Sequence, residues 1–541
     1  MLPIPPAVPS FEEPGPPFCS RLPSGHEDLW RPAPTPPWRP APAQDCQGEP
    51  LQGELRMRPS PSPLAPLGLT CCLSFVALSP ALAAADEEAQ EDTSSVFVIR
   101  AAQVVVRPGE VLENTAILVR DGRIVRIAAD LETPDGAVEV QGEVVCAGFI
   151  DPWSALGLDG SVLDDRSSDA ATRTADGVDL FSNDHLRAEA LRAGVTLARL
   201  QGGYRAAVGG LGAFVRLDPA LDSASEAIVD DSAGLAMSLG LSLPGSMRFS
   251  RGSDGSLRML SGDRAVDVFD RVEAVDRVAA AIETGRQYRE REVEYRYELE
   301  EWQKAIDEKT LKLEKDFKKA KKSRKKDQDK AEDKGKEFKE KKYKEDKRPR
   351  APKFNAERAE LARVAAGETP LVVEVHRASE IRNLLEATKG FTRLRLVIAG
   401  ASESLSVAAE LAERSVPVIV WPSLSGTSRP DELSASDLSL AGNLAAEGVT
   451  VLLGSGGRDA AAARDLPLLA ALAVGHGLDP ELAFKALTSL SAETFDLADR
   501  LGSVEIGKDA DLLVLDAMPF HPGASVRYVF SGGRLAITPE N

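Results

Sequence analysis

The sequence predicts an α/β fold with a (β/α)8 TIM-like barrel, because short apolar runs alternate with helical segments through the middle of the chain. Such runs indicate buried strands. The segments that we expect to be strands cover residues 194–200, 371–376, 394–399, 416–420 and 449–456. In barrels of this type the active site lies at the carboxyl ends of the strands. The residues at those ends therefore decide which chemistry is available.

Short strands separated by turns are expected on both sides of this region. Before it lie apolar runs at 96–99, 115–119 and 123–127, and Asp121-Gly122 between the last two is a strong hairpin signal. After it, the run 526–530 ends at the turn Gly532-Gly533. We therefore expect a small β-rich part at each end of the folded chain.

Two segments give the chain a specific resemblance to a known family. Gly148-Phe149-Ile150-Asp151 follows the apolar run 144–147 and resembles the first barrel strand of the amidohydrolase superfamily, whose pattern there is Gly-Phe-Ile-Asp-x-His-x-His. Residues 501–516 are similar to the family's closing segment. The resemblance is to the imidazolonepropionase-like branch, and it implies that both ends of the mature chain pair into one small composite β-sandwich beside the barrel. It also implies metal-dependent hydrolysis of non-peptide C–N bonds, of the cyclic amide type.

Composition and the resemblance together divide the chain into segments. These are a Pro-rich leader at 1–56, a signal peptide at 57–85, the first part of the sandwich at 95–147, the barrel at 148–502 and the second part of the sandwich at 503–541. A charged helical insertion at 285–353 interrupts the barrel.

The positions that carry the family's metal ligands hold residues of other types. In the family, two histidines spaced by one residue at the end of the first strand bind the metal, and Trp153 and Ala155 occupy those positions here. The family's last strand ends Gly-Ser-Asp, whereas this chain has Gly456 in place of the aspartate. An indole, a methyl group and a hydrogen atom cannot bind a divalent cation. Without the metal, the hydroxide fraction of a water molecule at neutral pH falls by roughly eight orders of magnitude, more than a general base contributing about 10²–10⁴-fold recovers.

His376 ends the expected strand 371–376 and matches the family's metal-ligating or substrate-facing histidine on a middle strand. A different interpretation is a strand-end histidine that is hydrogen-bonded to a neighbouring loop. The remaining histidines lie in the leader, on helical segments or in the small terminal part, and no Cys-rich or His-rich cluster offers another metal site: His26, His185, His476 and His521. We therefore expect no cofactor, unless His376 belongs to a rearranged zinc site.

We expect a family member that is catalytically impaired and serves as a binding or accessory protein. Its pocket candidates are Trp153, Ser154, His376 and Ser455, and the indole of Trp153 offers a face on which a small-molecule ligand can stack. One alternative is an active metal-dependent amidohydrolase whose ligands are rearranged around His376. A second is a scaffold subunit that pairs with an active paralogue, or a homo-oligomer. A Gly-x-Ser-x-Gly elbow is absent from the sequence, which argues against a serine hydrolase.

The charge and the start of the chain bear on partners and location. A formal net charge of −19 and a pI of about 5.0 argue against nucleic-acid binding by the body of the protein. Met57-Arg58, the mostly apolar stretch 64–78 and small residues at 81–85 form the layout of a signal peptide. We therefore expect export to the periplasm or the cell exterior, with the true start near Met57. Cleavage would leave Cys146 as the single cysteine.

The insertion combines an apolar seam with a high charge. Its apolar residues fall close to heptad spacing on an expected helix: Tyr295, Leu299, Trp302, Ile306, Leu313 and Phe317. Lysines then dominate residues 318–326, and Pro349 and Pro352 end the helical pattern. One interpretation is a long solvated helix, of coiled-coil type, that frays into a linker. The other is a docking arm whose basic tract meets an acidic surface.

Overall fold

The computed structural model describes residues 96–158, 169–179, 184–202, 208–221, 223–239, 249–251, 257–259, 268–332, 347–422, 437–457 and 460–539. All of them belong to a unit that spans Ala89–Asn541. The other unit, Met1–Glu88, lies outside the described residues, as do the expected leader and signal peptide. None of the helices in the described ranges is both long and apolar enough to span a membrane.

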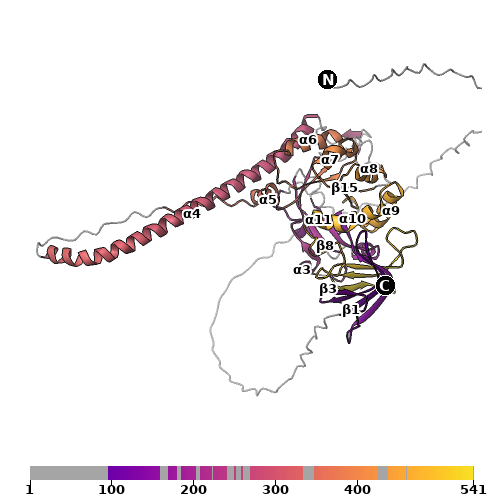
Figure 1. Ribbon diagram of the computed structural model, residues 1–541. Helices are drawn as coiled ribbons and strands as arrows, with labels where there is room; N and C mark the ends of the chain where they lie inside the picture. The colour runs from indigo at the N-terminus through magenta and orange to yellow at the C-terminus, as the bar shows by residue number, and fades with distance from the viewer. Residues whose placement is uncertain are drawn as a thin grey trace, which may run out of the picture. The chain divides into compact units, whose positions relative to one another are not determined.

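A seven-stranded sheet joins the two ends of the described chain (Figure 1). In spatial order its strands are β19 (Arg534–Ile537), β18 (Val526–Ser531), β17 (Leu512–Leu515), β4 (Val138–Ala147), β1 (Phe97–Arg107), β2 (Glu110–Arg120) and β3 (Arg123–Ala128). β17 runs antiparallel to β4, with Cys146 opposite Leu513. Asp121 and Gly122 both have positive φ, 51° and 76°, as the tight hairpin between β2 and β3 requires. The two ends therefore share one sheet, and the two-sheet sandwich that the resemblance implies stays a prediction.

Two further sheets carry the strands expected of the barrel. One has the order β16 (Val451–Leu453), β15 (Val418–Val420), β14 (Leu396–Gly400), β13 (Leu371–Val375), β10 (Leu235–Ser238) and β7 (Val208–Leu211). The other has the order β5 (Phe149–Ser154), β6 (Val195–Leu200), β8 (Ala213–Arg216) and β9 (Ile228–Asp230). A separate short hairpin consists of β11 (Phe249–Arg251) and β12 (Leu257–Met259).

The described strands do not close into the expected (β/α)8 barrel. In the six-stranded sheet, β10, β13, β14, β15 and β16 pair in parallel, and so do β5 and β6 in the four-stranded sheet. Between β6 and β10, however, the chain forms three strands that pair antiparallel: β7 with β10, β8 with β6, and β9 with β8. This departure from parallel pairing separates the two sheets on one side. On the other side β16 and β5 form no ladder, and a backbone hydrogen bond from Gly456 N–H to Trp153 O, 3.1 Å long, links their ends.

The two sheets share one apolar core. Its buried members come from strands of both sheets: Ile150, Leu197, Phe214, Ala236, Val372, Ile419 and Leu452. Phe495 and Leu501 from the C-terminal part of the chain complete it. Full burial of a large aliphatic or aromatic side chain contributes about 1.5–3 kcal/mol. The common core therefore holds the two sheets together without a continuous ladder.

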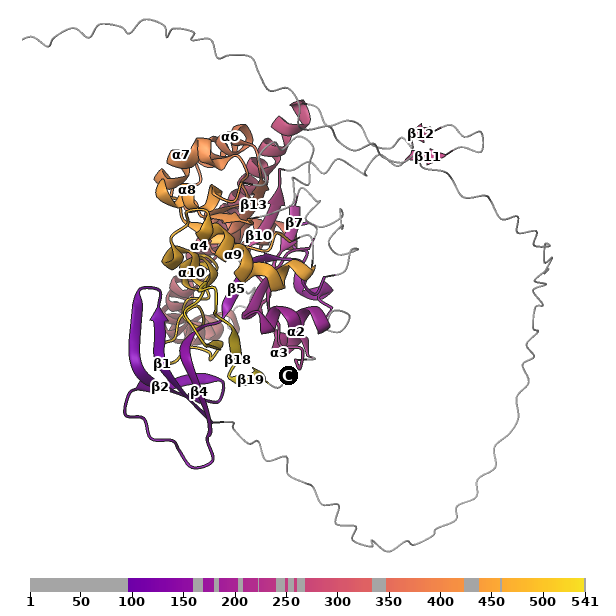
Figure 2. The ribbon, with the colours of Figure 1, turned by 90° about the vertical axis from the view of Figure 1, so that its right-hand side faces the viewer.

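Helices pack on the outside of these sheets (Figure 2). They are α2 (Asp184–Arg192), α5 (Ala356–Ala365), α6 (Ala378–Thr388), α7 (Ala408–Glu413), α8 (Leu440–Ala446), α9 (Leu466–Gly475), α10 (Pro480–Leu487) and α11 (Ser489–Thr494), with a short α3 (Ala224–Ala227). Single 3-10 turns are η1 (Thr174–Gly177), η2 (Ser404–Val407) and η3 (Ala460–Asp465). Buried leucines such as Leu191, Leu384 and Leu444 join the helices to the strands in one core.

Residues 285–332 of the charged insertion belong to α4 (Val268–Glu332), a helix of 65 residues that Figure 1 shows as a single long element. The helix begins before the expected insertion because its first turns are part of the core, where Val275, Val278 and Ile282 are buried. Farther along, Val293 and Tyr297 are exposed, and side-chain pairs one turn apart, such as Arg286–Glu290 at 2.6 Å, support the helix. The expected long helix is therefore present through residue 332, and the coiled coil and the docking arm stay predictions.

Candidate functional site

Three aromatic rings gather at the carboxyl ends of the strands. Trp153 lies near the end of β5, His376 directly follows β13, and Trp421 directly follows β15. The two indole rings are stacked, with centroids 6.3 Å apart and planes 20° apart. The His376 ring meets that of Trp421 edge to face at 5.8 Å. The sequence predicted the first two residues but not Trp421, although it follows its strand as His376 does.

Trp153 is packed into the interior. Only 3% of it is exposed, and the guanidinium carbon of Arg199 lies 5.3 Å from the centroid of its ring. Arg199 is fully buried and donates hydrogen bonds to the backbone oxygens of Ala233 (2.5 Å) and Gly234 (3.2 Å). Burial lowers the pKa of Arg199 to about 9. With Trp421 and Arg199 against it, the Trp153 ring has little surface left on which the expected ligand could stack.

The loop after β16 is shaped by glycines that lie against the two tryptophans. A Cβ atom at Gly454 would lie 3.2 Å from the Cβ of Trp153, and one at Gly457 would lie 2.5 Å from its Nε1. At Gly456, which has a φ of +99°, a Cβ atom would lie 3.2 Å from Cγ of Trp421. An aspartate at this position would therefore be strained in its backbone and crowded by the indole.

Asp151 links β5 to the loop that follows β16. Its Oδ1 accepts hydrogen bonds from the N–H groups of Trp153 (3.2 Å) and Ser455 (3.0 Å). The carboxyl group is fully buried, and burial raises its pKa to about 6 against the opposing effect of the hydrogen bonds from Ser455. Ser455 also donates from Oγ to Trp153 O at 3.2 Å, and its neighbour Ser154 is buried beside it. Both serine pocket candidates, Ser154 and Ser455, thus lie at the junction of β5 and β16. The sequence did not predict that Asp151 links these two strands.

His376 is hydrogen-bonded through Nδ1, and its Nε2 lies near a carboxylate. Nδ1 lies 2.8 Å from Oγ of Ser402, in the turn after β14. Nε2 lies 3.6 Å from Oε1 of Glu374, two residues earlier on β13. Both His376 and Glu374 are buried, and Ser238 of β10 donates to Glu374 Oε2 at 3.4 Å. The contact with Ser402 agrees with the interpretation of a strand-end histidine bonded to a neighbouring loop.

Residues 303–536 match the model of the amidohydrolase family, a range that contains β13 to β18 and most of β19. Residues 303–536 thus form an amidohydrolase family domain. Among solved structures, the chain is similar to an amidohydrolase from Thermotoga maritima MSB8, with a TM-score of 0.58 and 22% identity over 82% of this chain and 100% of that one. This likeness supports the fold. No curated protein sequence is significantly similar to the chain.

Two further solved structures match with lower TM-scores. One is an ochratoxinase from A. niger, with a TM-score of 0.44 and 18% identity over 82% of this chain and 96% of that one. The other is a prolidase complexed with N-methylphosphonate-L-proline, with a TM-score of 0.44 and 16% identity over 82% of this chain and 99% of that one.

The strand ends offer few metal donors. Within the described ranges, no group of three or more His, Cys, Asp or Glu side chains is placed to hold a metal ion. His376 and Glu374 supply one nitrogen and one carboxylate, whereas catalytic zinc sites use three protein ligands and a water. Trp153, Ala155 and Gly456 add no donor side chain. The described side chains do not fit such a metal.

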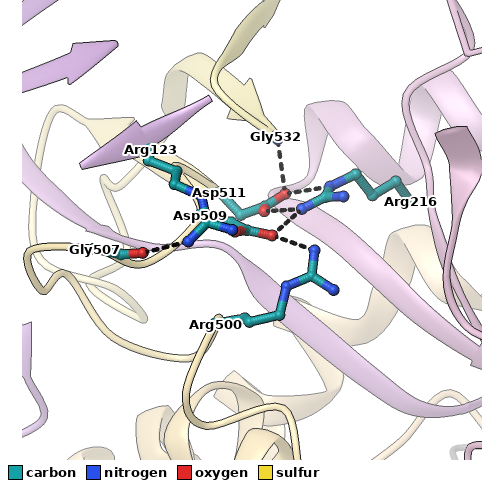
Figure 3. A network of polar contacts seen from close by, with 7 residues as sticks. All are labelled: Arg123, Arg216, Arg500, Gly507, Asp509, Asp511 and Gly532. Atoms are coloured by element: carbon teal, nitrogen blue, oxygen red, sulfur yellow. Dashed lines mark hydrogen bonds and ion pairs between the residues drawn. The ribbon is translucent and has the colours of Figure 1, made fainter. Parts of the chain in front are cut away.

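Asp509 and Asp511 of the closing segment form ion pairs with Arg216 (Figure 3). Nη2 of Arg216, on β8, lies 2.9 Å from Oδ2 of Asp509 and 2.9 Å from Oδ2 of Asp511. Asp509 also pairs with Arg500 at 2.7 Å, and Asp511 accepts the N–H of Gly532 at 3.1 Å. These contacts join the four-stranded sheet to the seven-stranded one. Asp509 and Asp511 of the closing segment therefore have a structural role in this chain.

Proposed function

We propose that this amidohydrolase-family protein has lost the family's metal-dependent hydrolysis of cyclic amide C–N bonds and serves as a binding or accessory protein. The observation that carries the proposal is the stacked pair of Trp153 and Trp421. The glycines at 454, 456 and 457 give this pair its space. The site is therefore remodelled as a unit, because the loop that would present the family's aspartate has adopted a shape that favours glycine.

The surface that remains for a ligand lies beside this pair. Trp421 and Ser402 are half-buried, whereas Trp153 is covered. An aromatic edge next to a hydroxyl and an imidazole suits a small ligand with a ring and a polar substituent. We propose such a ligand, bound against Trp421 and not stacked on Trp153.

The test is the metal content of the purified chain. We expect less than about 0.1 zinc per chain by elemental mass spectrometry after dialysis against a buffer with micromolar zinc, in the wild type and in His376→Ala alike. We also expect no hydrolysis of cyclic amides above the rate of the His376→Ala variant. Retention of about one zinc by the wild type, lost in the variant, would refute the proposal.

That contrary outcome would support a second candidate, a rearranged metal site. The 3.6 Å approach of His376 Nε2 and Glu374 Oε1 is the observation in its favour. In that case Glu374→Gln would lower the zinc content as His376→Ala does, since the carboxylate would be a ligand. The third candidate, a scaffold that pairs with an active paralogue, predicts that a metal-bearing amidohydrolase co-purifies with the chain.

Export is proposed on the sequence layout of residues 57–85. Mass mapping of the natural N-terminus should begin after about residue 80. Peptides from residues 1–50 in the mature protein would refute both the signal peptide and the start near Met57.

A further inference from the structure

The turn that follows β14 has an unusual backbone. Gly400 and Ala401 both have positive φ, 88° and 51°, and this region is uncommon for alanine. A Cβ atom at Gly400 would lie 2.7 Å from Nε2 of His376, so the position suits only glycine. Two backbone hydrogen bonds fix the turn to the end of β13, Ala401 N–H to Val375 O at 2.8 Å and Glu403 N–H to His376 O at 2.9 Å.

The effect of this sharp turn is to bring Ser402 to His376. Its Oγ lies 2.8 Å from Nδ1, within the range of a strong hydrogen bond. Backbone conformations in sparsely populated regions cluster at functional sites. Strand, sharp turn, serine and helix also follow one another here, since η2 and α7 begin at Ser404 and Ala408. The same order of elements holds the nucleophile in serine hydrolases.

The other side of the imidazole supports the same arrangement. The carboxylate of Glu374 lies 3.6 Å from Nε2 and favours the tautomer with its proton on that nitrogen. Nδ1 then carries the lone pair and accepts the O–H of Ser402. A hydroxyl, an imidazole and a carboxylate therefore follow in line from β14 to β13. The first contact is a hydrogen bond of 2.8 Å, and the second is a charge contact at 3.6 Å.

We propose that Ser402 is a nucleophile that takes the acyl group of an activated ester, with His376 as its general base and Glu374 as the group that orients His376. As Oγ bonds to the carbonyl carbon, Nδ1 of His376 takes the hydroxyl proton. The bond from that carbon to the leaving oxygen then breaks, and the leaving oxygen receives the proton. Water, deprotonated by His376, attacks the acyl–Ser402 ester, and the carboxylic acid and the free serine are released.

The substrate class follows from the donors around Ser402. The N–H of Glu403 is bonded to His376 O, and that of Ser404 to Ala401 O at 2.9 Å, so neither is placed to stabilise an oxyanion. Base and nucleophile alone contribute about 10²–10⁴-fold. That suffices for esters with a phenol-like leaving group and not for amides. The ring of Trp421, 5.8 Å from that of His376, offers contact to an aryl ester.

This reaction goes beyond the proposed function and does not depend on it, because no metal takes part. The segment Gly400-Ala401-Ser402-Glu403-Ser404 also shows why the sequence did not reveal it. It differs from the Gly-x-Ser-x-Gly pattern only at the fifth position.

The experiment uses the full chain after removal of metals with a chelator, treated with a fluorophosphonate probe. Intact mass and peptide mapping should show one adduct, on Ser402, in the wild type. Ser402→Ala should show none, and His376→Gln should react at least tenfold more slowly. The matched control is Ser406→Ala, an exposed serine in the same turn that donates to Glu403 O at 3.1 Å, and it should react as the wild type does.

Two results would overturn the assignment. One is a folded wild-type chain, checked by circular dichroism, that gains no adduct at Ser402. The other is an adduct that forms equally fast in His376→Gln, which would show that the imidazole does not act as a base. If the wild type holds zinc before the chelator treatment and gains the adduct after it, the proposed function is refuted and this assignment stands.

Discussion

The pair of carboxylates around Arg216 should make this residue one of the most sensitive positions for stability. Arg216 is 9% exposed and contacts Asp509 and Asp511 at 2.9 Å each. Burial opposes its charge, but the two aspartates outweigh that effect and raise its pKa. Arg216→Met keeps the length of the side chain and removes the guanidinium, which leaves buried carboxylates without their partner.

Breaking a buried pair in this way costs about 3–5 kcal/mol. Asp509 retains Arg500 at 2.7 Å, and Asp511 retains the N–H of Gly532, so the lower end of that range, about 3 kcal/mol, is expected. Urea unfolding followed by far-UV circular dichroism measures the loss. Adding Asp511→Asn to Arg216→Met should restore part of it, since the second change removes an unpaired charge.

The matched control is Arg126→Met. Arg126 is exposed and lies 3.9 Å from the exposed Asp130, so its loss should change the free energy of unfolding by less than about 0.5 kcal/mol. If Arg216→Met also changes the free energy of unfolding by less than about 0.5 kcal/mol, the network does not hold the two sheets together.

The remaining predictions concern the strand ends. Burial raises the folded-state pKa of Asp151 from 3.8 to about 6, so its protonated form should contribute about 3 kcal/mol below pH 4, lost as the pH rises through 6. Urea midpoints at pH 5 and pH 7 should therefore differ more for the wild type than for Asp151→Asn, and an equal difference would contradict this. Gly456→Asp should cost about 1–3 kcal/mol in the same assay and bind no zinc, whereas Gly390→Asp, at a site with open space, should be near neutral. Trp153→Ala should cost about 3–5 kcal/mol, and a loss below 1 kcal/mol would show that its packing is loose.

Local signals predicted much of the fold. The hairpin at Asp121-Gly122 and the strands that lead to His376 and Gly456 lie where apolar runs and turn residues indicated them. The closed barrel did not follow, because β7 and β8 are short antiparallel strands in a glycine-rich stretch that carries no clear period. α4 begins at Val268, before the expected insertion at 285. Its first turns belong to the core, and the charge that marks the insertion begins only after them.

The site was harder to predict, because its contacts join residues far apart in the sequence. Trp153 and His376 were found by comparison with the family pattern. The sequence did not predict Trp421, Arg199 or Ser402, because each belongs to the site through a contact with a residue on another strand. Periodicity gives the face of a strand but not the side chain across from it.

The pairing of Cys146 with Leu513 has a consequence for how the polypeptide matures. During synthesis β4 emerges early, and its hydrogen-bonding edge must wait for β17, which is made nearly last. An open edge of this kind invites association with other chains. Completion of the sheet should therefore be a late event in vivo, so truncation before residue 512 should yield aggregates and not a smaller folded product.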